Sequence, residues 1–496
     1  MNRHAASRAR PDPDLARELF ASLGLDALLP EKLAGWRTLL AEAMAFFLDR
    51  LPEARLAAIV AEQFALADTA APGVRIAALL AHCPTLHKLG QVIARHPGLD
   101  AGLRHALQAL ESMPPTTDIA PLLAAARAEL GGDSGVHLAE RALAEGSVAI
   151  VLPCSWREHG LLREGVLKAL KPGVALRLGE ELAILPALGD FLVGRGAELG
   201  LPAIDYHGYL AAAGRLLKEE IRLDREQAHM RIASTLLAAD AHVFVPALLP
   251  WCTPALTAME RIHGAKLADA IVAPHEARRL GRALVGGLLA RPFWSPAERA
   301  LFHGDLHGGN LLRADDGRIA VLDWSLAAHL DKAQREALVD LALAALALDT
   351  GRIASALAGL GLVESCSASV SATVDQALDN FVCSGRALGF DWLIGLLDAL
   401  ALQGGSGFGE QLAVFRKSWL SLAGVLGDLG AGADADLPLI DLGVRRLAAE
   451  WPARLLAPAD SRAFATHVST ADLWRAAADI FPASLRYWAR LLGRAY

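Results

Sequence analysis

Cysteine is scarce in this sequence and forms no pattern. The 496 residues include five cysteines, an odd number, and no two of them have Cys-x-x-Cys spacing. A disulfide framework or a structural zinc site needs paired or closely spaced cysteines. We therefore expect neither, and a reducing, cytoplasmic environment fits the composition best.

Long apolar runs and basic clusters are missing as well. The most apolar stretch, 338–348, contains Asp340 and is shorter than the roughly 18 residues needed to cross a bilayer. Residues 1–14 are polar and include Pro11 and Pro13, unlike a signal peptide. The net charge is −7 without a Lys/Arg-rich run. We therefore expect no nucleic-acid partner, and a protein that is soluble or attached peripherally to a membrane.

Tyrosine is rare, with four residues, whereas hydrophobic residues make up 53% of the chain and alanine and leucine are abundant. Such a mix favours packed helices over sheets. Apolar residues at three- and four-residue spacing predict helices within 14–118, 180–237, 264–303 and 332–429. Short apolar runs bounded by turn residues predict strands at 147–154, 165–170, 243–246 and 256–260.

The most informative segment has the sequence HGDLHGGN at 303–310 and is followed by LDW at 322–324. Asp305 and Asn310 are five positions apart, and Asp323 follows after thirteen more. A kinase-type catalytic loop has the pattern H-x-D-x-x-x-x-N and is followed, after a hairpin, by a metal-binding aspartate at a strand end. An Asp-Gly pair between the two segments predicts that hairpin.

These residue types suit the transfer of a phosphoryl group between two oxygen atoms. Asp305 is expected to position or deprotonate the nucleophile, and Asn310 and Asp323 are expected to hold Mg²⁺ through oxygen ligands. The alternative is that His303 and Asp305 only cap a turn in an unrelated α/β protein. The three spacings together with the hairpin favour the catalytic interpretation.

Five further segments carry a resemblance to a known family. They are KLGQ at 88–91, AEGS at 144–147, VLK at 166–168, EIRLDRE at 220–226 and MERIHG at 259–264. With the catalytic loop, they make residues 75–430 similar in order and spacing to the UbiB/AarF atypical kinases, also called the ADCK family. The K-x-G-Q helix is the most specific match, because ordinary kinases lack it.

The resemblance implies a role for each segment. It assigns Lys168 to the α- and β-phosphates of ATP, with Glu226 as the carboxylate that holds Lys168 in place. The resemblance also implies that the nucleotide is bound by Ala144, Gly146, Ser147 and Glu260. It implies a gate over the nucleotide cleft formed by Lys88, Gly90, Gln91 and Glu220. Two alternatives stay open: Lys168 and Glu226 could be ordinary solvated side chains, and the Gly-Ser turn could be a plain hairpin.

Three departures from the family pattern bear on regulation and substrate. Arg222 replaces the second carboxylate of the E-x-D motif, and its charge would repel Lys88 unless Asp224 compensates. The metal motif reads Asp-Trp-Ser, ending at Ser325, in place of Asp-Phe-Gly, and the catalytic loop lacks the family's proline. In these positions the chain looks like the aminoglycoside and choline phosphotransferases.

The segment 472–496 combines apolar and basic residues. It carries Trp474, Phe481 and Trp488 among several arginines. One interpretation is an amphipathic helix at a membrane surface, on the inner face. The other, which is favoured because Pro482 interrupts the pattern, is a terminal helix docked on the protein with its aromatic side chains in the core.

We expect an α+β, bilobal protein-kinase-like fold that is mostly helical and has a helical N-terminal extension. The expected regions are the extension at 1–130, the N-lobe at 136–262, the C-lobe at 263–430 and a helical tail at 437–496. The expected activity is that of an ATP- and Mg²⁺-dependent kinase or ATPase acting on a lipid-like or small-molecule substrate, in a pathway such as ubiquinone biosynthesis. The alternatives are a small-molecule hydroxyl kinase like the aminoglycoside phosphotransferases, and a nucleotide-binding pseudokinase scaffold.

Overall fold

The computed structural model describes most of the chain and divides it into two compact units. The described residues are 34–66, 75, 78–79, 82–94, 119–131, 134–202, 205–267, 272–363, 367–384, 389–402, 409–430 and 436–492. The first unit comprises 1–225 and 248–261, and the second comprises 226–247 and 262–496. The bounds expected for the four regions stay predictions.

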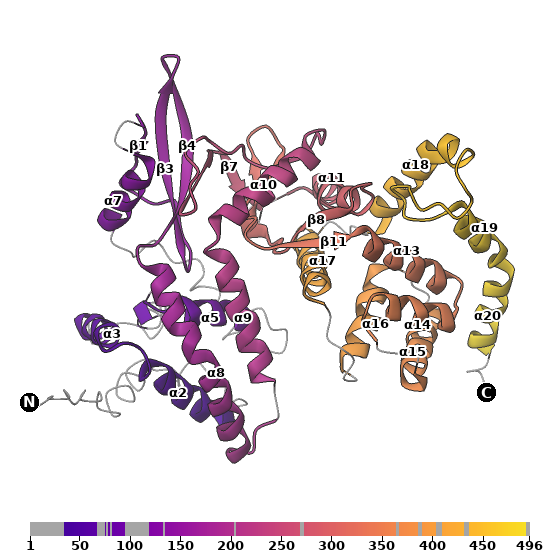
Figure 1. Cartoon of the computed structure of the whole chain (residues 1–496), viewed down its shortest axis with the longest axis horizontal. Helices are drawn as coiled ribbons and strands as arrows, with labels where there is room; N and C mark the ends of the chain where they lie inside the picture. Colours follow the sequence, from indigo (N-terminus) through magenta and orange to yellow (C-terminus); the bar gives the residue numbers. More distant parts are fainter. Residues whose placement is uncertain are drawn as a thin grey trace, which may run out of the picture. The chain divides into compact units, whose positions relative to one another are not determined.

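The first unit combines helices with a small antiparallel sheet (Figure 1). Its helices are α2 (Ala34–Leu48), α3 (Glu53–Ala65), α5 (Pro84–Ala94), α7 (Ile119–Leu130), α8 (Val174–Glu198) and α9 (Tyr206–Glu220). Its strands are β1 (His137–Leu138), β2 (Ala144–Glu145), β3 (Ala149–Glu158), β4 (Leu161–Leu170) and β6 (Leu256–Glu260). The strands pair in the order β1-β3-β4-β6, and β2 also pairs with β3.

The β3–β4 hairpin is the longest ladder of this sheet (Figure 1). Side chains alternate along a strand, so β4 buries Leu167 and Ala169 while Lys168 lies on the other face. The sequence predicted both strands but made them too short. The reason is that the outer half of the hairpin is largely exposed and mixes charged residues with Leu161 and Leu162, so it lacks the continuous apolar run that marked the inner half.

An apolar core holds the helices of the first unit together. Phe47 of α2, Ile59 of α3, Leu86 of α5 and Leu188 of α8 are buried in it. Helices were expected throughout 14–118, and the described residues of that range form α2, α3 and α5. Burial of such side chains contributes roughly 1.5–3 kcal/mol each, which makes this core the main source of stability for the helices.

The second unit is mostly helical. Its helices are α10 (Leu223–Leu237), α11 (Pro274–Val285), a π-helical turn (Gly286–Ala290), α12 (Arg291–Phe293), α13 (Lys332–Leu346), α14 (Thr350–Gly359), α15 (Ala368–Ser384), α16 (Phe390–Leu402), α17 (Glu410–Asp428), α18 (Asp436–Arg454), α19 (Thr470–Ala478) and α20 (Ile480–Leu492). Its strands are β5 (Val243–Phe244), β7 (Gly264–Lys266), β8 (Arg299–His303), β9 (Leu311–Ala314), β10 (Ile319–Val321) and β11 (Ala327–Asp331).

Two small sheets of the second unit hold the predicted catalytic segment. One has the strand order β5-β10-β9-β7, and the other pairs β8 with β11. The β9–β10 hairpin is present as predicted, with Ala320 opposite Leu312. Its turn contains Gly317 at φ +84°, a conformation that glycine adopts without a steric penalty.

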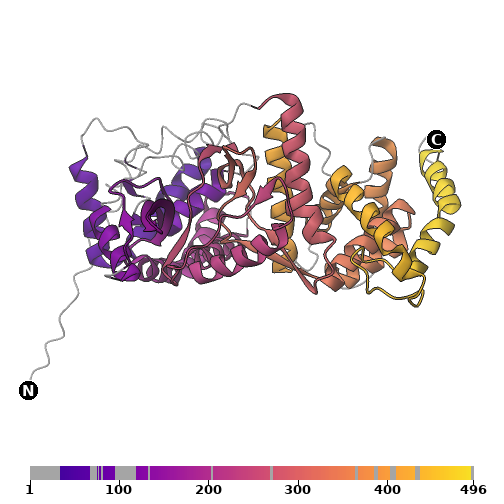
Figure 2. The same cartoon turned by 90° about the horizontal axis from the view of Figure 1, so that it is seen from above.

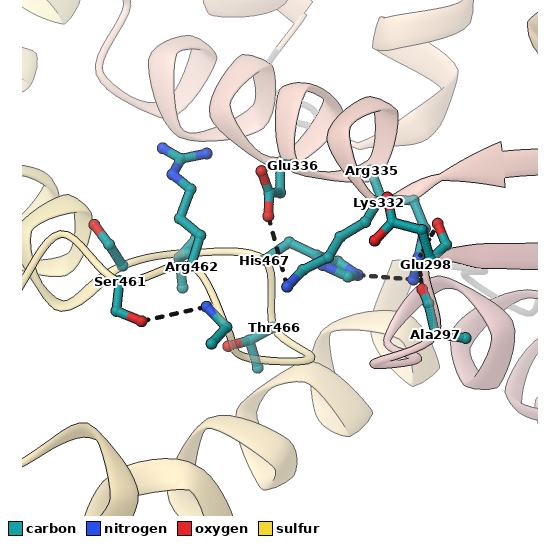
Figure 3. A network of polar contacts seen from close by, with 12 residues as sticks. Ala297, Glu298, Lys332, Arg335, Glu336, Ser461, Arg462, Thr466 and His467 are labelled. Carbon is teal, nitrogen blue, oxygen red and sulfur yellow. Dashed lines mark hydrogen bonds and ion pairs between the residues drawn. The ribbon is translucent and has the colours of Figure 1, made fainter. Parts of the chain in front are cut away.

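Arg335 of α13 anchors the segment 293–297, which precedes β8, and lies beside His467 of the segment that precedes α19 (Figure 3). Its side chain is fully buried and donates hydrogen bonds to the carbonyl oxygens of Phe293, Ser295 and Ala297. His467 lies beside it, with φ +60°, and its Nε2–H donates to the Phe293 carbonyl oxygen at 2.7 Å. Burial, with the Arg335 charge close by, lowers the pKa of His467 to about 4.

The last helix, α20, contacts the rest of the second unit through Arg486 and Arg490, whereas two of its aromatic residues are exposed. Arg490 pairs with Asp375 at 2.6 Å and with Asp379 at 2.7 Å, both on α15. Phe481 and Trp488 are 71% and 56% exposed, and no residue of α20 is fully buried. The expectation that these aromatic side chains lie in the core is therefore wrong. Figure 2 shows the helix at the outer edge of its unit.

Pro482 was expected to interrupt the helical pattern of the tail, and the tail does form two helices, with α19 ending at Ala478 and α20 beginning at Ile480. Pro482 lies in the first turn of α20, where backbone N–H groups have no intrahelical acceptor and a proline costs little. Among the described helices, α20 included, none is long and apolar enough to span a bilayer.

Candidate active site

The histidine of the catalytic loop joins two segments of the second unit. His303 is buried at the end of β8. Its Nε2–H donates to the Leu322 carbonyl oxygen at 3.0 Å, and its Nδ1 accepts the N–H of Asp305 at 3.1 Å. This pattern requires the neutral imidazole, in agreement with the lowered pKa of His303 that burial causes. His303 therefore ties Asp305 to the strand end that precedes Asp323.

Asn310 is bonded to the same loop. Its side-chain Nδ2–H donates to the backbone carbonyl oxygen of Asp305 at 3.0 Å. The backbone carbonyl oxygen of Asn310 accepts the N–H of Leu322 at 2.8 Å. With Nδ2 used in this way, Oδ1 is the Asn310 atom suited to a hard metal ion. The structure thus brings together Asp305 and Asn310, which the sequence placed five positions apart.

Asp323 follows β10 in a left-handed backbone conformation, with φ of +52°. Such a φ is uncommon outside glycine, although aspartate tolerates it better than most residues. The N–H of Ser325 donates to Asp323 Oδ1 at 3.3 Å and orients the carboxylate. Backbone strain of this kind is concentrated at ligand sites, where the surrounding structure supports it.

Trp324, which stands where a phenylalanine was expected, packs beneath the loop. Its buried ring lies edge-on to His303, with the centroids 4.7 Å apart, and its Nε1–H donates to the Val321 carbonyl oxygen at 3.2 Å. Its carbonyl oxygen lies 2.9 Å from Nδ1 of His229 on α10. The Asp-Trp-Ser departure therefore preserves a packed metal motif.

Asn310 and Asp323 fit Mg²⁺, because this ion takes oxygen ligands and usually combines one or two protein groups with phosphate oxygens and waters. In the described part of the chain, no three His, Cys, Asp or Glu side chains gather so that they could hold a metal by themselves. Two protein oxygens are sufficient for an ion that bridges phosphates, and the ion would neutralise charge on the phosphate oxygens.

One charged residue at this site was not predicted from the sequence. Lys417 of α17 forms an ion pair with Asp305, with 3.0 Å between Nζ and Oδ1. Nothing in the local sequence of α17 distinguishes Lys417 from other surface cations. Its position follows from the packing of α17 on β8 and β11, which only the fold reveals.

In the first unit, Lys88 contacts Glu220, with which the resemblance grouped it in the gate. The other oxygen of Glu220 accepts the hydroxyl hydrogen of Ser147 at 3.0 Å. These three side chains connect the K-x-G-Q helix α5, the end of α9 and the predicted nucleotide loop. Gly90 and Gln91 follow on α5, but their side-chain surroundings lie outside the described residues. A gating role for this contact stays a prediction.

A buried carboxylate fixes the start of the K-x-G-Q helix. Glu181 of α8 is fully buried and accepts the N–H of Thr85 at 2.8 Å, while Arg55 pairs with the same carboxylate. The first N–H groups of a helix lack intrahelical acceptors, and an anion beside them is stabilising. Glu181 therefore positions α5 and, with it, Lys88.

The Arg222 departure is compensated within its own turn. Arg222 makes two hydrogen bonds of 3.0 Å to Asp224. These bonds lower the pKa of the Asp224 carboxyl. Asp224 thus neutralises Arg222, as its compensating role predicted, and Glu220 remains the partner of Lys88.

The predicted nucleotide loop is a tight turn in this structure. Ala144 belongs to β2, and the N–H of Gly146 donates to the Ala149 carbonyl oxygen at 2.8 Å. This bond closes the turn between β2 and β3, as in the plain-hairpin alternative. The hydroxyl of Ser147 is bonded to Glu220. Contact of these residues with a nucleotide stays a prediction.

Lys168 lies within β4, opposite Thr257 of β6, and Glu260 ends β6. These residues share the sheet of the first unit. Glu226 lies on α10 and belongs to the second unit, as do the catalytic-loop and metal residues. The pairing of Lys168 with Glu226, and a nucleotide site shared by Lys168 and the metal ligands, stay predictions.

Residues 134–357 match the model of the ABC1 atypical kinase-like domain. The matched range contains Ser147, Lys168, Glu220 and the catalytic loop. The fold is therefore kinase-like, and this part of the chain is similar to the ABC1 atypical kinase-like domain. The resemblance to the UbiB/AarF family is confirmed. Lys88 and Lys417 both lie outside the matched range.

Several curated proteins are similar to this chain. The uncharacterized protein Rv0647c of Mycobacterium tuberculosis is 30% identical over 277 residues, which cover 53% of this chain and 54% of the relative. A probable protein kinase UbiB of Shewanella sp. is 25% identical over 298 residues, which cover 58% and 50%. The Arabidopsis thaliana protein ACTIVITY OF BC1 COMPLEX KINASE 1, chloroplastic, is 25% identical over 230 residues, which cover 46% and 33%.

The chain spans about half the length of the curated relatives it matches. Among solved structures, the Rv3197–erythromycin complex from Mycobacterium tuberculosis is 18% identical and has a TM-score of 0.42, with 70% of this chain and 83% of that chain covered.

Proposed function

We propose that the protein is an ATP- and Mg²⁺-dependent atypical kinase or ATPase of the UbiB type, acting in a lipid or small-molecule pathway. The observation that carries this proposal is the bonded loop of the second unit. Asn310 is bonded to the backbone of Asp305, and His303 connects Asp305 to the strand end before Asp323. The ABC1-type domain supports the same activity.

In this proposal Asp305 orients the acceptor hydroxyl and takes its proton. Asn310 and Asp323 hold the metal through oxygen atoms. Lys168 binds the α- and β-phosphates, and Glu226 holds the Lys168 ammonium in position. Substrate-binding energy and electrostatic positioning, and not covalent catalysis, would supply most of the rate enhancement.

Two other functions have some support. The first is a small-molecule hydroxyl kinase, because the Asp-Trp-Ser motif resembles that of the aminoglycoside phosphotransferases. These phosphotransferases lack the K-x-G-Q helix, however, so the contact of Lys88 with Glu220 favours the UbiB type. A nucleotide-binding pseudokinase scaffold is the second. The pairing of Arg222 with Asp224 weakens it, because that pairing removes the main objection to a functional E-x-D segment.

Nucleotide binding and turnover test the proposal together. MgADP or MgATP at about 100 times its Kd should stabilise the protein by about 2.7 kcal/mol, which raises Tm by several degrees. ATP turnover should be measured with and without detergent-solubilised lipid. Binding without turnover in either condition would favour the pseudokinase. The absence of both binding and turnover at millimolar nucleotide would refute the proposal.

A peripheral contact with the inner face of a membrane is part of the same proposal. Its support is α20, whose arginines face the second unit while Phe481, Leu485 and Trp488 are exposed. Aromatic residues of this kind favour the membrane interface. Co-sedimentation with vesicles tests it: Trp488→Ser with Phe481→Ser should reduce binding at unchanged Tm, and equal binding would exclude α20 as the contact.

A further inference from the structure

The ion pair between Lys417 and Asp305 joins the catalytic loop to a helix outside the family-matched range. Nζ of Lys417 lies 3.0 Å from Oδ1 of Asp305, and both side chains are partly exposed. The ABC1-type match ends at residue 357, well before α17 begins. The role expected for Asp305 therefore involves a residue that the family comparison does not include.

Packing holds α17 against the strands that lead into and out of the loop. Phe415 packs edge-on against Phe302 of β8, with ring centroids 4.8 Å apart, and both rings are buried. The side-chain oxygen of Gln411 accepts the N–H of His329 on β11 at 2.7 Å. Two independent contacts therefore hold α17 in position, and they place the Lys417 ammonium beside the Asp305 carboxylate.

The catalytic loop is shaped for close approach to α17. Gly304 separates His303 from Asp305, and a Cβ atom there would lie only 2.8 Å from Cγ1 of Val414 on α17. It would also meet Leu326 at 2.6 Å. Glycine is therefore needed at this position, because any side chain would push the loop and the helix apart.

Lys417 brings to the loop a permanent positive charge of a kind that the loop sequence lacks. The sequence HGDLHGGN at 303–310 contains no lysine or arginine. The N–H of Asp305 donates to His303, and the carbonyl oxygen of Asp305 accepts from Asn310, so these two bonds fix the backbone of Asp305 and not its carboxylate. A catalytic group needs a supporting side chain that holds its own rotamer, and the Lys417 ammonium contacts the carboxylate directly.

We propose that Lys417 is a positioning residue that holds the Asp305 carboxylate toward the acceptor oxygen; this inference rests on the proposed function. In the transfer step, the acceptor oxygen forms its bond to the γ-phosphorus of ATP while the bond from that phosphorus to the bridging oxygen breaks. ADP leaves with the electron pair of the broken bond, and the acceptor's proton passes to Asp305. Lys417 keeps its proton throughout.

The test compares neutral and charged replacements of Lys417 with a matched control on the same helix. Lys417→Met removes the charge at similar volume, and Lys417→Arg retains it. Arg416→Met is the control, because Arg416 is similarly exposed and also forms an ion pair, but with Asp398 at 2.6 Å on α16. For each variant, kcat and KM for ATP, the Kd for MgADP and Tm are measured in the full chain.

We expect Lys417→Met to lower kcat roughly 10- to 100-fold, the scale on which misplacing a catalytic group by about 1 Å reduces rate. The MgADP Kd and the Tm of Lys417→Met should stay close to those of the wild-type protein. Lys417→Arg should recover most of kcat, and Arg416→Met should have wild-type kinetics.

Equal kcat for Lys417→Met and Arg416→Met would overturn this inference but not the proposed function. A kcat loss that follows a fall in Tm, without recovery by arginine, would make the pair structural. Absence of turnover in the unchanged protein would instead refute the proposed function.

Discussion

Two lysine–carboxylate pairs, one in each unit, differ in what surrounds them. The side chains of Lys88 and Glu220 are 14% and 19% exposed, and Glu220 also accepts a hydrogen bond from Ser147. Lys417 and Asp305 are 35% and 18% exposed, and the lysine is open to solvent on one side. The pair of the first unit belongs to a polar network with Ser147, whereas that of the second unit lies at a loop with catalytic spacing.

A second ion pair of the first unit is buried near His87. Lys171 and Glu145 are 2.6 Å apart and buried, and the Lys171 charge, after burial itself, lowers the pKa of His87 to about 4. Breaking a buried pair leaves an uncompensated charge, which is costly, so such a network favours a single arrangement of its segments. The two carboxylates are similarly exposed, at 19% and 18%, but Lys417 is more exposed than Lys88, so the ion pair of the second unit is weaker in energy. We infer that the first pair fixes structure and the second assists chemistry.

The largest effect that separates the two pairs should come from Asp305. Asp305→Asn should lower turnover by roughly 10²–10⁴ and leave nucleotide affinity nearly unchanged, because it removes the proton acceptor and not a phosphate ligand. Asp316→Asn, at the exposed hairpin turn, is the control. If Asp305→Asn loses nucleotide binding together with turnover, Asp305 is structural or a metal ligand, and the contrast between the two pairs fails.

The next effect concerns the metal side of the loop. Asp323→Asn should abolish the Mg²⁺ dependence of nucleotide binding, because it removes a charged ligand. Asparagine tolerates the positive φ of this residue, so the backbone can stay in place. Thermal shifts with ADP, with and without Mg²⁺, measure it. An unchanged Mg²⁺ effect would show that the ion, if bound, uses other ligands.

A smaller, regulatory effect is expected from the pair of the first unit. Lys88→Ala should change the ATPase rate or the preference between ATP and ADP severalfold without unfolding the protein, because the contact with Glu220 connects α5 to the predicted nucleotide loop. Arg195→Ala, which breaks the 2.6 Å ion pair to Glu42 in the same unit, is the control. Identical kinetics for the two variants would mean that α5 contributes packing only.

The smallest effect is a pH dependence of stability in the second unit. An unfolded histidine binds a proton below a pH of about 6.5, whereas folded His467, with a pKa of about 4, does so only in more acidic solution. Between these values the unfolded state binds more protons, so the free energy of unfolding should fall as the pH is lowered. Tm measured from pH 7.5 to pH 4.5 should show this decrease.

A matched pair of variants isolates that contribution. His467→Asn keeps a residue that tolerates positive φ and should flatten the pH profile of Tm, even if Tm is lower throughout. His159 also has a positive φ, of 48°, but lies exposed at the β3–β4 turn, so His159→Asn should leave the profile unchanged. Equal slopes for the two variants would remove His467 as the cause.

The sequence by itself determined the features that depend on neighbouring residues. The spacing of His303, Asp305 and Asn310, and the Asp-Gly turn of the β9–β10 hairpin, predicted local structure that is present. Short-range spacing is read reliably because backbone geometry and hydrogen-bonded turns constrain residues a few positions apart. The Lys88–Glu220 contact spans 132 positions and was anticipated only because a family resemblance had already paired the two segments.

Only the tertiary structure decided the features that depend on packing between distant segments. Lys417 lies at Asp305 because Phe415 and Gln411 attach α17 to β8 and β11, and no local pattern in α17 encodes that placement. The direction of α20 was likewise not readable: an amphipathic pattern shows that two faces differ, but not which face meets the protein. Here, Arg490 forms ion pairs with Asp375 and Asp379 of α15, and the face with Phe481 and Trp488 is exposed.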